Sequence, residues 1–88
     1  MTKTRSEVME WLVNRIAVDI GLPAAKIPLD VNLSRYGLDS VRAIEITSDM
    51  SDWLGVEVSA TAMWDFHTVT ELVDAVMSGK ALTSSPAV

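Results

Sequence analysis

Apolar residues recur at helical spacing in three separate stretches of this chain. In the first stretch they fall at every fourth position, as Val8, Leu12, Ile16 and Ile20. Such spacing places them on one face of a helix. Thr4 and Glu7 stand three residues apart ahead of the pattern, as in a capping box, and Gly21 follows it as a stop signal. We therefore expect a helix over residues 7–20.

Two later stretches show the same kind of pattern. Residues 40–54 carry a broad apolar set, which we expect to form one helix face: Val41, Ile44, Ile46, Met50, Trp53 and Leu54. Residues 69–77 follow Thr68, which begins a second capping box, and are also predicted to be helical. A short helix fits residues 60–66, with Ser59 as its N-cap.

The connection between the first two long helices, residues 21–39, is long for a domain of 88 residues. It is rich in turn-forming residues but also contains spaced apolar ones, so we expect it to be pinned across the helices with a short helical turn. The predicted fold is all-α: an antiparallel four-helix bundle of three long helices and one short one, with a long loop between helices one and two. We assign residues 1–80 to this domain and residues 81–88 to a flexible C-terminal tail.

Composition and charge narrow the classes of function. Apolar residues make up 49% of the chain and mean hydropathy is +0.26, which indicates a folded domain. Cysteine is absent, and the single histidine, His67, cannot build a metal site alone, so we expect no metal and no catalytic residues. With no apolar run near the roughly 20 residues of a membrane span and no signal peptide, a cytoplasmic protein is expected.

Negative charge is concentrated in the second half of the chain. Residues 36–79 carry eight acidic side chains and one basic side chain, Arg42, which gives a net charge of −7. A field of this sign repels nucleic acid and attracts basic protein surfaces. We therefore expect protein partners and no nucleic acid.

The chemistry of the chain centres on the tetrad Gly37-Leu38-Asp39-Ser40, where the long connection meets the second helix. Asp and Ser are both favoured N-cap residues, so ordinary capping is one interpretation of Ser40. Capping needs only one of them, however, and Gly37 permits a tight turn that presents the serine. A helix N-terminus also favours a phosphate group. Ser40 is therefore a candidate site for a phosphate-linked modification.

This tetrad resembles the phosphopantetheine motif of the acyl carrier protein family, and the resemblance spans roughly residues 8–76. Val41 stands where the family usually has leucine, and Ile44-Glu45-Ile46 resembles the hydrophobic-Glu-hydrophobic run of its recognition helix. Residues 63–69 resemble the family's stretch before the last helix, although His67 replaces the usual proline.

The resemblance implies that 4'-phosphopantetheine is attached to Ser40 by a phosphopantetheinyl transferase, with Gly37, Leu38, Asp39 and Val41 as motif support. The arm would carry acyl groups as thioesters for polyketide or fatty-acid-like synthesis. The implied partners are acyltransferase, ketosynthase or acyl-activating enzymes, and we expect the chain to be a monomer. We call the expected partner-binding residues the docking surface; they are Ile44, Glu45, Asp49 and Asp52.

Several alternatives remain open from the sequence. A peptidyl or aminoacyl carrier usually shows Gly-Gly-x-Ser, so Asp39 favours the acyl carrier. A helical interaction module that is never modified would use Ser40 only as a cap. The docking surface can equally be a solvated helix face, and His67 is expected to have a loop or capping role. Trp53 and Trp64 are expected in the core or at its rim, with lining of an acyl pocket as the alternative.

Overall fold

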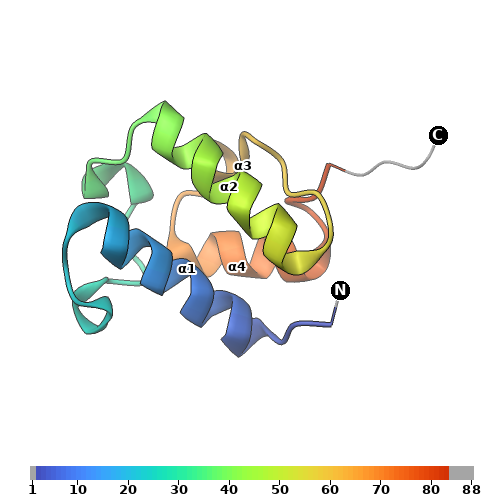
Figure 1. Ribbon diagram of the computed structural model, residues 1–88, viewed down its shortest axis with the longest axis horizontal. Helices are drawn as coiled ribbons and strands as arrows, with labels where there is room; N and C mark the ends of the chain where they lie inside the picture. Colours follow the sequence, from blue (N-terminus) through green and yellow to red (C-terminus); the bar gives the residue numbers. More distant parts are fainter. Residues whose placement is uncertain (1, 84–88) are drawn as a thin grey trace.

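The computed structural model describes residues 2–83 and confirms the all-α prediction (Figure 1). It has four α-helices, which are α1 (Arg5–Ile20), α2 (Ser40–Leu54), α3 (Ala62–Asp65) and α4 (Val69–Ser78). Two short 3₁₀ turns, η1 (Ala24–Lys26) and η2 (Leu33–Tyr36), lie in the long connection between α1 and α2. In Figure 1, α1 runs opposite to α2 and α4, as expected of an antiparallel bundle.

The helix boundaries follow from side-chain caps. Thr4 and Glu7 form both hydrogen bonds of a capping box, which starts α1 at Arg5, two residues before the predicted start. The hydroxyl of Thr68 accepts a hydrogen bond from the Glu71 amide and starts α4 where predicted. The short helix α3 begins at Ala62, later than expected, because Ser59 forms a turn with Thr61 instead of capping the helix.

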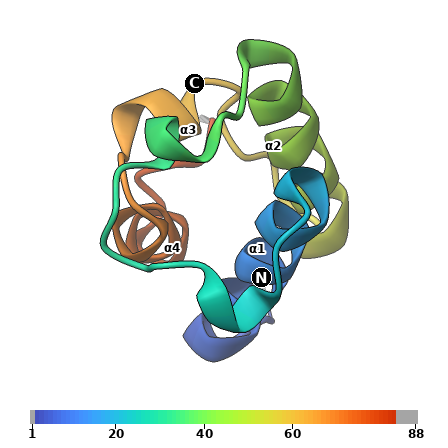
Figure 2. The same cartoon turned by 90° about the vertical axis from the view of Figure 1, so that its left-hand side faces the viewer.

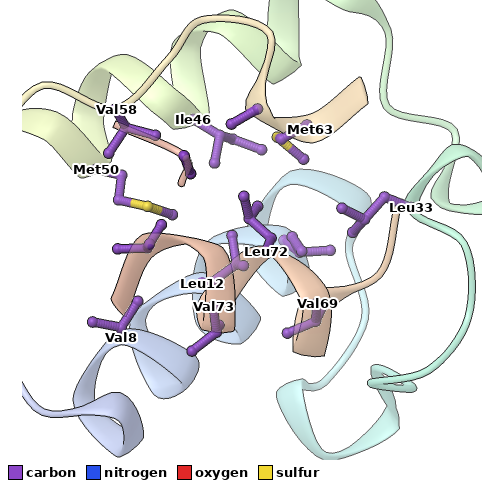
Figure 3. Packing of buried hydrophobic residues seen from close by; sticks show 14 of the residues in the cluster. Val8, Leu12, Leu33, Ile46, Met50, Val58, Met63, Val69, Leu72 and Val73 are labelled. Atoms are coloured by element: carbon purple, nitrogen blue, oxygen red, sulfur yellow. The ribbon is translucent and has the colours of Figure 1, made fainter. Parts of the chain in front are cut away.

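The core lies where α1, α2 and α4 face one another (Figure 3). Its largest fully buried apolar side chains come from all three helices: Leu12, Ile16, Ile46, Met50, Leu72, Val8, Val69, Val73 and Val76. Fully burying one aliphatic side chain of this size contributes about 1.5–3 kcal/mol. The apolar stripes predicted for the first and last helices therefore face the core, together with Ile46, Met50 and Leu54 of the face predicted for the second helix.

The apolar face predicted for the second helix is wrong at its N-terminal end. Val41 is 63% exposed and Ile44 is 47% exposed, whereas Ile46 and Met50 are fully buried. A helix turns by about 100° per residue, so the buried face that contains Ile46 and Met50 cannot also contain Val41. At the other end of α2, Trp53 is half-buried and stacks on Trp11 of α1, with ring centroids 5.5 Å apart.

The connection between α1 and α2 is pinned, as the sequence predicts. Ile27 and Leu33 are buried in the core. The amide of Leu33 donates a hydrogen bond to the carbonyl oxygen of His67 at 2.6 Å, which ties the connection to the segment before α4. Figure 2 shows this connection passing along one side of α4 before it reaches α2. The connection is therefore tied to α4 and to the segment before it, and the amide of Thr70 also donates to the carbonyl oxygen of Leu29.

The packed chain continues beyond the predicted domain end at residue 80. Ala81 is buried, and its carbonyl oxygen accepts a hydrogen bond from the Ser59 amide at 2.7 Å. Val58 and Leu82 form an isolated antiparallel bridge, and the amide of Thr83 donates to Glu57. Residues 81–83 therefore belong to the folded unit, not to a tail, because they close the end of the core. The remainder of the predicted tail, residues 84–88, lies outside the described residues.

Candidate attachment site

Ser40 is the first residue of α2, and its hydroxyl is not used to cap the helix. The cap is Asp39, whose carboxylate accepts a hydrogen bond from the Arg42 amide at 2.8 Å. Ser40 is exposed, and within residues 2–83 its hydroxyl forms no hydrogen bond. The two adjacent residues therefore have different roles: Asp39 caps the helix, and Ser40 presents a free hydroxyl.

The backbone around Ser40 suits a negatively charged group. Gly37 ends η2 with φ 74°, a left-handed conformation that glycine adopts without strain, and the chain then turns into α2. The first amides of α2 point towards the Ser40 end of the helix, and a helix of 15 residues carries a partial positive charge there. The amides and the partial positive charge at this end of α2 would both stabilise a phosphate ester formed on the Ser40 hydroxyl.

Three large apolar side chains on neighbouring elements are exposed. Val41 and Ile44 lie one and four residues after Ser40 on α2, and Trp64 lies on α3, where it is 47% exposed. The prediction that Val41 and Ile44 lie on the buried face is wrong, whereas the place of Ile44 in the docking surface stays a prediction.

A cavity of about 270 Å³ opens between the start of α2, α3 and the long connection. The residues that line it are Asn32, Leu33, Ser34, Leu38, Asp39, Ala43, Met63, Trp64 and His67. Leu38 and Asp39 directly precede Ser40, so the cavity lies beside the candidate attachment site, although Ser40 itself does not line it. Trp64 lines it, whereas Trp53 belongs to the separate stack with Trp11.

The acidic side chains of the docking surface are not equivalent. Glu45, Asp49 and Asp52 are all exposed on α2. Asp49, however, forms an ion pair with Arg15 of α1. Arg15 also contacts Asp19 at 3.3 Å, so it bridges two carboxylates. The sequence shows the spacing of four between Arg15 and Asp19, but the contact with Asp49 depends on how α1 and α2 pack.

The sequence also bears on metal binding, membrane crossing and the role of His67. Within residues 2–83, no group of three or more His, Cys, Asp or Glu side chains is placed to hold a metal ion. None of the helices in that range is long and apolar enough to cross a membrane. His67 was predicted to have a loop role; it lies in the segment before α4, its carbonyl anchors Leu33, and the residue also lines the cavity.

Comparison with known proteins identifies the family. Residues 10–76 match the family model described as "Phosphopantetheine attachment site". The match covers most of the chain, and the chain therefore belongs to this family of carrier proteins. The group that the family carries is 4'-phosphopantetheine, and the free hydroxyl, helix N-terminus and adjacent cavity at Ser40 fit a phosphate-linked arm.

Two relatives show where such domains occur. The chain is 31% identical over 71 residues to one subunit of the phenolphthiocerol/phthiocerol polyketide synthase of Mycobacterium tuberculosis, covering 81% of this chain but only 4% of that protein. It is 32% identical over 57 residues to the acyl carrier protein TtuC of Teredinibacter turnerae, covering 65% of this chain and 66% of that protein. The chain thus spans a very small part of the synthase polypeptide and about two thirds of TtuC.

Solved structures share the fold. A free-standing peptidyl carrier protein from Acinetobacter baumannii superposes with a TM-score of 0.79 at 24% identity, covering 85% of this chain and 94% of that one. The HMG-ACPI domain of the CurA module from Lyngbya majuscula superposes with a TM-score of 0.75 at 23% identity, covering 92% and 87%. At this level of identity the likeness establishes the carrier protein fold.

Proposed function

We propose that this chain is an acyl carrier protein whose 4'-phosphopantetheine arm is attached to the Ser40 hydroxyl, and that it serves polyketide or fatty-acid-like synthesis. The observation that carries this proposal is the exposed, uncommitted Ser40 hydroxyl beside a helix cap already supplied by Asp39. Membership of the phosphopantetheine family supplies the chemistry that such a hydroxyl would receive. Oligomeric state and location remain predictions: a monomer in the cytoplasm.

The residues of the chain would hold the 4'-phosphopantetheine arm, and the arm would supply the reactive group. The arm would supply a terminal thiol that holds acyl groups as thioesters. Asp39 fixes the start of α2, so that the amides and the positive end of that helix face a phosphate on Ser40. The cavity lined by Leu38, Met63 and Trp64 would shield apolar atoms next to the attachment site from water.

The choice between acyl and peptidyl cargo rests on Asp39. The residue before the serine is acidic here, which resembles acyl carriers more than the Gly-Gly-x-Ser pattern of peptidyl carriers. Two relatives, at 31% and 32% identity, are part of a polyketide synthase and a protein named as an acyl carrier. A peptidyl carrier is the second candidate, because a protein of that name shares the fold with a TM-score of 0.79.

The proposed partners are a phosphopantetheinyl transferase, which would use this chain as its substrate, and acyltransferase, ketosynthase or acyl-activating enzymes. Such enzymes must bind briefly and release, which favours small interfaces steered by charge. The docking surface on α2 begins four residues after Ser40, and it combines an exposed apolar residue, Ile44, with carboxylates. We propose that basic patches of these enzymes bind there.

The first experiment tests attachment at Ser40. The purified chain is incubated with coenzyme A, Mg²⁺ and a broad-specificity phosphopantetheinyl transferase, and its intact mass is measured. We expect one arm per chain for wild type and none for Ser40→Ala. Ser48→Ala, which removes another exposed hydroxyl from α2, is the matched control and should be modified like wild type. Attachment to the Ser40→Ala protein would contradict the assignment, and a wild type that is never modified would favour the interaction module.

A second experiment separates the two kinds of cargo. The arm-bearing protein is offered to acyl-activating enzymes with carboxylic acids and to amino-acid-activating enzymes with amino acids, and the mass of the loaded protein is read. We expect efficient loading by the first group. Preferential loading with amino acids would favour the peptidyl carrier while leaving the attachment site intact.

A further inference from the structure

The side chain of Arg15 crosses from α1 to α2 and takes one carboxylate of the docking surface as its partner. Its guanidinium group forms ion pairs with Asp19, on its own helix, and with Asp49, on α2. The Arg15 side chain is only 22% exposed and that of Asp19 only 10% exposed, whereas that of Asp49 is 54% exposed. The contact therefore joins a half-buried cation to a carboxylate at the surface.

An isolated surface ion pair contributes little, because two long side chains must be ordered to form it. Here most of that ordering is already provided by Asp19, whose Oδ2 atom lies 3.3 Å from Arg15 Nε and whose Oδ1 atom lies 3.6 Å from Arg42. The planar fork of arginine can hold two carboxylates at once. Burial alone would lower the pKa of Arg15, but hydrogen bonds and ion pairs with Asp49 and Asp19 raise it. The cation is thus held in place for Asp49.

Glu45 and Asp52 are in a different situation on the same helix. Both are exposed, and within residues 2–83 neither forms an ion pair. They lie seven residues apart, which is two helical turns or about 10.5 Å along one face of α2. Ser48 lies between them and Ile44 lies beside Glu45, and both of these residues are exposed. These two carboxylates remain available to cations of another protein.

We propose that Arg15 withdraws Asp49 from the docking surface, so that a basic partner enzyme binds α2 through Glu45 and Asp52 beside Ile44. This inference rests on the proposed carrier function, because it assumes that α2 is where partner enzymes bind. The partner that fits presents two cationic side chains about two helical turns apart, with an apolar side chain against Ile44. Arg15 then determines which carboxylates of α2 bind the partner, although Arg15 itself need not contact the partner.

The test is a double-mutant cycle on binding. The chain without its arm is titrated into a fluorescently labelled phosphopantetheinyl transferase in the absence of coenzyme A, at 0.15 M ionic strength or below, and Kd is measured. The variants are Arg15→Gln, Asp49→Asn and the two combined. Changes in net charge add in such a cycle and cancel, so that only the coupling between Arg15 and Asp49 remains.

We expect Asp49→Asn to weaken binding about two- to fivefold more in the Arg15→Gln background than in wild type, the range of a surface ion pair. One control cycle, Arg15→Gln with Asp52→Asn, should be additive, because Asp52 forms no ion pair within the described residues. Arg15→Lys keeps the charge but cannot bridge both carboxylates, so it should change binding in the same direction as Arg15→Gln and substitutes for it if that variant does not fold.

Additivity in the Arg15–Asp49 cycle would overturn the inference, as would a transferase that does not bind wild type at all. Neither result depends on arm attachment, which the intact-mass experiment reads separately. A chain that binds the transferase but never gains an arm would contradict the proposed function and not the withdrawal of Asp49. A chain that gains its arm but shows an additive Arg15–Asp49 cycle would contradict the withdrawal of Asp49 and not the proposed function.

Discussion

The two faces of α2 show how one helix serves two purposes. On the inner face Ile46 and Met50 are fully buried against α1 and α4. On the outer face Val41 and Ile44 are 63% and 47% exposed, although their side chains are equally apolar. Because burying such a side chain contributes about 1.5–3 kcal/mol, the fold leaves stabilisation unused at the outer face.

The difference indicates that position around the helix axis, and not hydrophobicity, separates the two sets: Ala43, between Val41 and Ile44, is buried on the inner side. The exposed pair lies within about one turn of the free serine hydroxyl, and the buried pair begins after it. A partner that covers Val41 and Ile44 would recover part of the unused stabilisation, which suits brief binding. The inner face then stabilises the fold, and the outer face is left to bind a partner.

The largest expected effect comes from the inner side of the bundle. Replacing Ile46 or Leu72 by alanine should lower the free energy of unfolding by about 2–5 kcal/mol, because each side chain is fully buried and leaves a cavity. Urea denaturation followed by circular dichroism measures this loss. Val41→Ala is the matched control on the outer face, and we expect it to change stability by no more than about 0.5 kcal/mol. Equal losses for Val41→Ala and Ile46→Ala would abolish the distinction between the faces.

A smaller effect is expected from the charges of the outer face. Reversing Glu45 and Asp52 together to lysine should slow association with the transferase by about tenfold at low salt, with the fold retained. Asp49 is left unchanged in this variant, because a lysine there would face Arg15. Stopped-flow measurements at rising ionic strength provide the check, since the Debye length falls from about 30 Å at 0.01 M to about 8 Å at 0.15 M.

Wild-type association should slow as salt is added, and the double reversal should show a weaker or inverted dependence. Rates for wild type that do not change with salt would mean that the carboxylates of α2 are only a solvated helix face.

The smallest effect separates Asp39 from Ser40. Asp39→Ala removes the observed cap on the Arg42 amide and should cost about 1 kcal/mol of stability. Ser40→Ala removes no hydrogen bond within the described residues and should be nearly neutral for stability, while it abolishes arm attachment. Thermal unfolding of the two variants side by side provides the measurement. A larger loss for Ser40→Ala would show that Ser40 has a capping role after all.

The sequence predicted the features that depend on residues close together along the chain. The cap at Thr4 was recognised from two side chains three residues apart, and the start of α2 from the tetrad that ends at Ser40. The pinned connection was predicted because apolar residues such as Leu33 recur within it. These features are local, so one sequence is enough to reveal them.

Features that depend on packing between distant segments were not predictable in the same way. The exposure of Val41 follows from which side of α2 the other helices cover. The ion pair between Arg15 and Asp49 joins residues 34 positions apart. Trp64 of α3 lines a cavity together with Asp39 and Ala43 at the start of α2, and Ala81 is buried although it follows the last helix. The role of Ser40 itself stays a prediction until attachment is measured.

The most direct test of Ser40 as the attachment site is a comparison of backbone amide NMR spectra before and after the arm is attached. We expect chemical shifts to change at residues 38–45 and 63–67, which surround Ser40 and the cavity. The amides of Val8, Leu12 and Val73, in the core between α1 and α4, should keep their positions. Changes confined to another part of the bundle, or an arm found on any residue other than Ser40, would contradict the proposed attachment site.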